Sequence, residues 1–143
     1  MKALVLPLIL VAGSAVADPL PINPQVTQGN IQETICRPGY TKKIRPPVVV
    51  TNAIKKKRMR DLGLPFELMG DFQLDHKLSL SIGGHPSNES NLVLQDGEDA
   101  HQKDGVEHCT QRAICDGRIS LDEAQKQMWS DWRGLIPLCR GGK

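Results

Sequence analysis

Residues 73–103 run QLDHKLSLSIGGHPSNESNLVLQDGEDAHQK and combine several structural signals in a short space. Alternating polar and apolar residues predict a strand from Gln73 to Leu80. Glycines and a proline predict a turn-rich loop over Ser81 to Asn88, and a second short strand follows from Asn91 to Gln95. A helix is expected from about Glu98 to Ala113. The stretch therefore predicts a β-hairpin with a long loop, followed directly by a helix.

Two further helices are expected to flank this hairpin. The first runs from Asn52 to about Leu62 and is ended by Gly63 and Pro65. The second starts at Ser120, which forms a capping box with Glu123. Its apolar residues fall on one face and predict a core contact: Leu121, Ala124, Met128, Trp132 and Leu135. The fold class expected is α+β.

Residues 35–50, before the first of these helices, are expected to be extended. Pro46 and Pro47 break helices, and the β-branched run from Val48 to Thr51 favours a strand-like backbone. Thr51 would then cap the helix that follows.

The N-terminus has the features of an export signal. Lys2 precedes a short apolar run from Ala3 to Val11, and Ala15 and Ala17 fit a small-x-small cleavage site. Removing 17 of the 143 residues leaves 126, which is enough for one domain. The apolar run is much shorter than the roughly 20 residues of a membrane-spanning helix. We expect a secreted or periplasmic monomer without a membrane anchor.

The exported part divides into a leader and a domain. Residues 18–34 are punctuated by proline and glycine and are expected to be a mobile leader, and residues 35–143 are expected to form the domain, with a core at 73–113. All four cysteines lie in the domain, where an even count in an oxidising compartment indicates two disulfides with three alternative pairings.

Charge is unevenly distributed along the chain although the formal net charge is only +2. Nine basic residues and no acidic residue lie between Arg37 and Arg60, whereas acidic residues dominate from Asp61 to Asp104. On the expected helix 52–62 one face displays a basic edge, which is either a solvated surface or a phosphate-binding surface. This basic edge consists of Lys56, Lys57 and Arg60.

A set of polar residues in fixed order gives residues 73–103 a chemical interpretation. The pair Asp75-His76 is common by itself, but it is followed by Gly83-Gly84, by Asn91-Leu92 and by His101. In this order the chain resembles the HNH endonuclease family, whose ββα-metal fold packs a hairpin over a helix around one divalent cation. The flanking residues resemble an exported bacterial subgroup of that family. No Cys-x-x-Cys pair for a structural zinc is present.

The resemblance implies a role for each residue of this set. Asp75 and His101 would bind the metal, His76 would be the general base, and Asn91 would fix the orientation of that base. An imidazole with a pKa near ~6.5 suits a base at neutral pH, and a hard cation can stabilise charge on a phosphate. The cation expected is Mg²⁺, with Mn²⁺, Zn²⁺ and Ni²⁺ as alternatives.

Several neighbours compete for these roles or add to them. Asp104 and His108 share the helix face of His101 and are substitute metal ligands. Asn88 competes with Asn91 but lies in the loop. Lys103 and the basic edge are expected to bind phosphate. The resemblance also implies the disulfide pairing Cys36 with Cys115 and Cys109 with Cys139, with a local Cys109–Cys115 bridge as the rival.

The function expected is hydrolysis of phosphodiester bonds in DNA, with RNA as a further substrate, by a metal-dependent nuclease of little sequence specificity. Aromatic residues make up only 3% of the chain, which disfavours base stacking on single strands. The alternative is an exported module that binds DNA or other polyanions without catalysis. A zinc-binding structural module is a third hypothesis, but the spacing of its donors matches no usual zinc frame.

Overall fold

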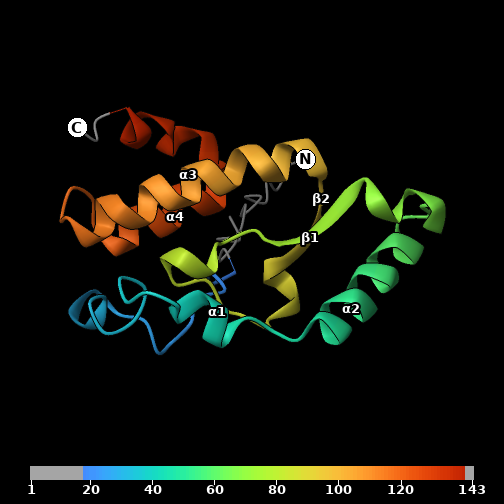
Figure 1. Ribbon diagram of the computed structural model, residues 1–143, viewed down its shortest axis with the longest axis horizontal. Helices are drawn as coiled ribbons and strands as arrows, with labels where there is room; N and C mark the ends of the chain where they lie inside the picture. The colour runs from blue at the N-terminus through green and yellow to red at the C-terminus, as the bar shows by residue number, and fades with distance from the viewer. Residues whose placement is uncertain (1–17, 141–143) are drawn as a thin grey trace, which may run out of the picture.

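The computed structural model describes residues 18–140, so the expected signal peptide lies outside the described residues. The protein is a mixed α+β structure in which a two-stranded antiparallel sheet lies among helices (Figure 1). No helix among the described residues is long and apolar enough to cross a membrane. In chain order the helices and strands are α1 (Tyr40–Ile44), α2 (Val48–Asp61), β1 (Phe72–His76), β2 (Leu92–Asp96), α3 (Gly97–Cys115) and α4 (Leu121–Asp131).

The expected hairpin is present, with a shorter first strand. β1 pairs with β2 in the register Phe72↔Asp96 to His76↔Leu92. β1 ends at His76 rather than at Leu80, because Ser79 accepts a hydrogen bond from the Ser81 amide and starts a 3₁₀ turn. The alternating apolar residues that predicted a strand are instead buried in this turn, which contains Leu80 and Ile82, and just before it, at Leu78.

The loop between the strands folds back on itself at its two glycines. Gly83 has φ 84°, a left-handed conformation that favours glycine, and ends the 3₁₀ turn. A Cβ on Gly84 would stand 1.8 Å from the Leu78 carbonyl oxygen, so only glycine allows this close approach. The Gly-Gly pair is thus explained by the path of the loop.

Helix α3 follows β2 without an intervening loop and is close to its expected extent. Asp96 caps it by accepting hydrogen bonds from the amides of Glu98 and Asp99. α3 contacts both strands of the hairpin and the C-terminal segment. In Figure 1 the hairpin lies between α2 at one end of the molecule and α3 with α4 at the other.

Helix α2 begins four residues before the expected Asn52, which corrects two predictions. Val48 to Thr51 are helical rather than extended, and Thr51 lies inside the helix, where its hydroxyl donates to the Val48 carbonyl at 3.1 Å. Pro47 precedes the first turn, where the missing amide hydrogen costs nothing. Val48 and Val49 are 72% and 76% exposed, so they lack the side-chain packing that stabilises β-branched residues in a sheet.

A second difference in the same region is the short helix α1, which replaces the extended backbone expected over residues 35–50. Gly39, with φ 81°, precedes α1, and the chain becomes extended only at Arg45, before the two prolines. The helical turn is local, and sequence alternation gave no sign of it.

Helix α4 and its apolar face agree with the sequence. Ser120 caps α4 by accepting from the Glu123 amide, and its hydroxyl also contacts the Glu123 carboxylate at 3.0 Å. The helix ends at Asp131, and a 3₁₀ segment, Trp132–Cys139, continues the core face. All members of the expected apolar stripe are buried: Leu121, Ala124, Met128, Trp132 and Leu135.

Residues 18–34 were expected to be a mobile leader, but they pack into the domain. Val26 and Ile31 are buried in the main apolar cluster, where their burial offsets the entropy lost on ordering the segment. Ile22 forms an isolated β-bridge with Gly84, and the His85 amide donates to the Pro21 carbonyl at 2.8 Å. The segment thus supports the loop of the hairpin.

Both disulfides have the expected pairing. Cys36 is bonded to Cys115, and Cys109 is bonded to Cys139. The first bond ties the N-terminal part of the chain to the end of α3, and the second ties α3 to the C-terminal 3₁₀ segment. Two disulfides fit a protein that folds in an oxidising compartment.

Candidate functional site

His76 stands at the end of β1 with its imidazole buried, and the residue is only 5% exposed. Its Nε2 lies 2.8 Å from the Pro86 carbonyl oxygen. A carbonyl can only accept, so Nε2 carries the hydrogen and the neutral imidazole has its lone pair on Nδ1. Among the described residues Arg58 Nε is the only buried side-chain nitrogen or oxygen without a hydrogen-bond partner. Within residues 18–140 the Nδ1 of His76 has no hydrogen-bond partner, so its lone pair is not used by the described part of the chain.

The surroundings of His76 keep its imidazole neutral. Burial lowers the pKa of His76 below its ordinary value of 6.5. The hydrogen bond to Pro86 and the charge of Asp75 act in the opposite direction, and the positive charges of Arg45 and Lys103 lower the pKa further. At neutral pH the side chain is therefore an uncharged base with an available lone pair.

Asn91 is fully buried, and its amide clamps the loop rather than the imidazole. Its Oδ1 accepts from the Leu78 amide at 2.7 Å, and its Nδ2 donates to the carbonyls of Leu78 and His85 at 2.9 and 3.0 Å. His85 immediately precedes Pro86, whose carbonyl holds His76. Asn91 thus acts on His76 through the loop. Asn88, its competitor, is exposed and caps a 3₁₀ turn by accepting from the Ser90 amide.

Asp75, the expected metal ligand, instead binds a lysine. Its Oδ2 lies 2.7 Å from the Nζ of Lys103, which reaches it from α3. The same ammonium donates to Glu107 Oε1 at 2.7 Å and to the His76 carbonyl oxygen at 2.8 Å. The side chain of Lys103 is 2% exposed, so its charge is buried, whereas the Asp75 and Glu107 side chains are partly exposed, at 22% and 18%. This group is called the Lys103 cluster below.

Lys103 was expected to bind phosphate, and its placement corrects that expectation. An ammonium has three hydrogens to donate, and in this structure each has an intramolecular acceptor. Burial lowers the pKa of Lys103, but the Glu107 and Asp75 carboxylates outweigh this effect and raise the pKa above its ordinary value. Lys103 therefore carries its positive charge at neutral pH.

Glu107 is the member of the cluster that sequence reasoning missed. Burial raises its pKa, Lys103 opposes the rise, and the charge of Asp75 adds to it. Glu107 lies one helical turn after Lys103, and this i,i+4 spacing was the available signal. Such pairs usually lie on solvated surfaces, as Asp122 and Lys126 do in α4.

The remaining expected metal ligands do not converge on Asp75. His101, Asp104 and His108 lie on α3 and are exposed. Within residues 18–140 no three His, Cys, Asp or Glu side chains gather closely enough to hold a metal ion. The residues present therefore do not fit a divalent cation bound by Asp75 and His101, because Oδ2 of Asp75 already binds the ammonium of Lys103.

A cavity of about 210 Å³ lies beside the Lys103 cluster. Glu107 and Ser79 form part of its wall, and exposed Arg45, whose charge acts on His76, forms another part. Its remaining wall is polar for the most part: Thr41, Leu80, Ser81, Asp104, His108 and Gln111. This cavity combines carboxylate, hydroxyl and guanidinium groups, and His76 is not among the residues that line it.

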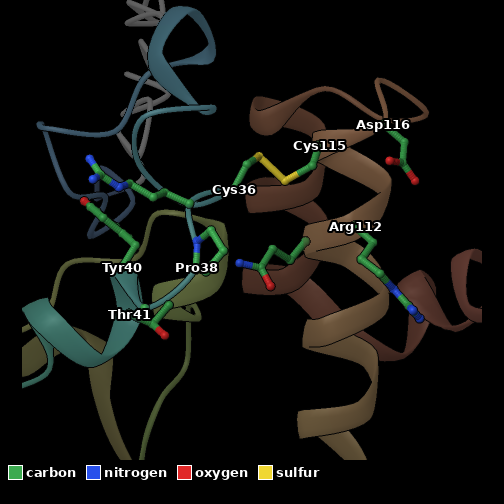
Figure 2. A pocket seen from close by; sticks show the side chains of 10 residues that line it. Cys36, Pro38, Tyr40, Thr41, Arg112, Cys115 and Asp116 are labelled. Atoms are coloured by element: carbon green, nitrogen blue, oxygen red, sulfur yellow. A yellow bond between two sulfur atoms is a disulfide. The ribbon is translucent and has the colours of Figure 1, made fainter.

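A second cavity of about 360 Å³ lies at the C-terminal end of α3 and shares Thr41 and Gln111 with the first. Figure 2 shows the Cys36–Cys115 disulfide joining its two walls, with Tyr40 and Thr41 on one side and Arg112 and Asp116 on the other. None of the residues expected to carry catalysis or to bind metal lines this cavity.

The basic edge of α2 faces outward, as its helical spacing predicted. Lys56, Lys57 and Arg60 are exposed, and of these Lys57 pairs with Asp61 at 3.1 Å. Lys55 and Arg58 point toward the hairpin instead, and each donates to a backbone carbonyl. These two hydrogen bonds fix α2 against β1 and against the loop before β2, while the basic edge stays exposed, with Lys57 paired to Asp61.

Comparisons of the chain with protein-family models, with curated proteins and with solved structures found no match.

Proposed function

We propose that this protein hydrolyses phosphodiester bonds of nucleic acid, DNA before RNA, with little sequence specificity. One observation carries the proposal: the Pro86 carbonyl fixes the tautomer of a buried, neutral His76 and leaves its Nδ1 as a base. Two disulfides support the further proposal that the enzyme acts outside the cytoplasm.

In the proposed reaction, Nδ1 of His76 takes a proton from a water molecule that attacks the phosphorus atom. The new P–O bond replaces the bond to the leaving sugar oxygen, which takes up a proton from solvent, and His76 then releases its own proton to solvent. The lowered pKa keeps the imidazole unprotonated at neutral pH, and the clamp of Asn91 on the loop keeps it in one orientation. A base held in place avoids the cost of ordering it during the reaction. Removing such a base typically costs on the order of 10²–10⁴ in rate.

Arg45 and the basic edge of α2 supply positive charge for the substrate. The Arg45 guanidinium lies beside the cavity and can bind a phosphate through two parallel hydrogen bonds. The basic edge would add phosphate contacts that are blind to sequence and weaken with salt. No step is assigned to a divalent cation here, because the expected ligands do not fit one.

The test is cleavage of supercoiled plasmid by purified protein and by His76→Ala, assayed with Mg²⁺ and with a chelator. His101→Ala is the matched control, because His101 is an exposed histidine of α3. We expect the wild type and His101→Ala to nick and linearise the plasmid and His76→Ala to leave it intact. Equal cleavage by His76→Ala after removal of contaminating nucleases would exclude His76 from the mechanism.

A polyanion-binding module without catalysis is the second candidate. It is favoured by the exposed basic edge together with the engagement of Asp75 by Lys103. Such a module would retard labelled duplex DNA in a gel without cleaving it under any condition, and His76→Ala would bind as the wild type does. Cleavage that depends on His76 would exclude this candidate.

A further inference from the structure

The Lys103 cluster has the composition of a cation site. Two carboxylate oxygens, from Asp75 and Glu107, and one backbone carbonyl oxygen, from His76, converge on a single point. Carboxylate and carbonyl oxygens are the donors that Mg²⁺ and Ca²⁺ take in proteins. At the point of convergence stands the Nζ of Lys103, at 2.7 to 2.8 Å from each oxygen.

The ammonium is well suited to fill that point. It is a compact charge whose three hydrogens match the three oxygens in number. Its side chain is 2% exposed, so displacement by a metal ion would require extracting Lys103 from the protein or deprotonating it. Two carboxylates around one ammonium also leave no uncompensated positive charge in the interior.

The position of the cluster connects it to the candidate base. Lys103 binds the side chain of Asp75 and the backbone carbonyl of His76, so one ammonium fixes two successive residues at the end of β1. Lys103 itself is buried and has no hydrogen left for a substrate. Its role is therefore that of a positioning residue for His76, because its charge is already balanced by Asp75 and Glu107.

From this geometry we infer that the Lys103 ammonium replaces the divalent cation, so that the site binds no such ion and works without one. The inference rests on the proposed function only where cleavage is the readout. The metal-binding readouts below are independent of any activity.

The first experiment uses the wild-type protein. Mn²⁺ binding is followed by the loss of the free-ion electron paramagnetic resonance signal, and the melting temperature is compared in chelator and in Mn²⁺. We expect no stoichiometric Mn²⁺, an unchanged melting temperature and plasmid cleavage at the same rate in chelator as in Mg²⁺. One Mn²⁺ per chain that is lost in Asp75→Asn, or cleavage only with added metal, would overturn the inference.

The second experiment removes the internal cation. Lys103→Ala opens the three-oxygen position, so this variant should bind one Mn²⁺, and its melting temperature should rise with Mn²⁺ concentration because the ion binds only the folded state. Lys103→Met keeps most of the side-chain volume without charge and should bind none. Lys126→Ala, which breaks an exposed carboxylate pair, is the control for general loss of a lysine. Equal Mn²⁺ binding by Lys103→Ala and Lys126→Ala would contradict the inference.

The outcomes separate the two proposals. If no form of the protein cleaves nucleic acid, the proposed function fails, while Mn²⁺ binding by the wild type and Lys103→Ala still decides whether Lys103 replaces a metal. If cleavage occurs but requires a divalent cation, the function stands and the inference fails. Should Lys103→Ala not fold, the measurements on the wild type are sufficient for this decision.

Discussion

Replacing Asn91 with alanine should lower the free energy of unfolding by about 3 to 5 kcal/mol. The side chain is fully buried and makes three hydrogen bonds to the backbone of the loop, one with its oxygen and two with its nitrogen. Alanine would leave one amide and two carbonyls of the backbone without these partners. Each group left unpaired inside a protein costs about 1 to 3 kcal/mol, and partial relaxation of the loop makes the lower part of that range appropriate.

The same substitution should affect the candidate base. The Lys77 amide donates to the Asn91 carbonyl at 2.8 Å, a backbone bond that alanine retains, so β1 and β2 should stay paired. The loop between them loses its clamp, and with it the fixed position of the Pro86 carbonyl. We therefore expect cleavage to fall more than the fraction of folded protein does.

Equilibrium urea denaturation, followed by tryptophan fluorescence, measures the first effect. Asn88→Ala is the matched control, since Asn88 is an exposed cap of the same loop and its loss should cost only about 1 kcal/mol. The reasoning would be refuted if Asn91→Ala lost less than about 1 kcal/mol, or no more than Asn88→Ala, at an unchanged denaturant slope.

Three further predictions concern pH, charge and covalent links. The pKa of His76 is lowered on folding, so the unfolded chain takes up a proton at higher pH than the folded protein does, and the free energy of unfolding should fall as pH drops from 6.5 to the folded pKa and level off below it. In urea midpoints measured against pH, His76→Gln should flatten this part of the profile. Replacing the basic edge of α2 with three alanines should reduce the magnitude of the negative slope of log affinity against log salt on duplex DNA by roughly 0.9 for each phosphate contact that is lost. An unchanged slope would mean that the edge makes no phosphate contact. Removing the Cys36–Cys115 bond should cost about 1 kcal/mol more than removing Cys109–Cys139, because the sequence separations are 79 and 30, and equal losses in thermal or urea unfolding would argue against an entropic origin.

The elements that the sequence predicted well are those whose local signals agree with their packing. α4 has a serine cap and an apolar stripe, and both are used in the structure. The start of α2 was predicted wrongly because the β-branched run from Val48 to Thr51 was weighted above the prolines before it. The β-propensity of valine comes from packing against neighbours in a sheet, and exposed Val48 and Val49 have no such packing. A proline at the start of a helix does not destabilise the helix, because the amide hydrogen that it lacks would have no partner there.

The site was accessible to sequence reasoning only in part. The pair Asp75-His76 could be singled out, but the partner of each side chain could not. Lys103 and Glu107 form an ordinary i,i+4 pair in the sequence, and nothing local indicates that this face of α3 meets the end of β1 and is buried there. Likewise, residues 18–34 contain too few apolar residues to predict from the sequence that Val26 and Ile31 are buried in the core.

The packing of residues 18–34 sets a lower limit on the fragment that can fold. The Asn23 amide donates to the Gly83 carbonyl, and the His85 amide donates to the Pro21 carbonyl, both at 2.8 Å. A shortened chain that starts at residue 35 would keep every strand and α-helix yet lose these supports of the loop next to His76. For recombinant work the chain should thus begin before Pro21, so that both hydrogen bonds to the loop are kept.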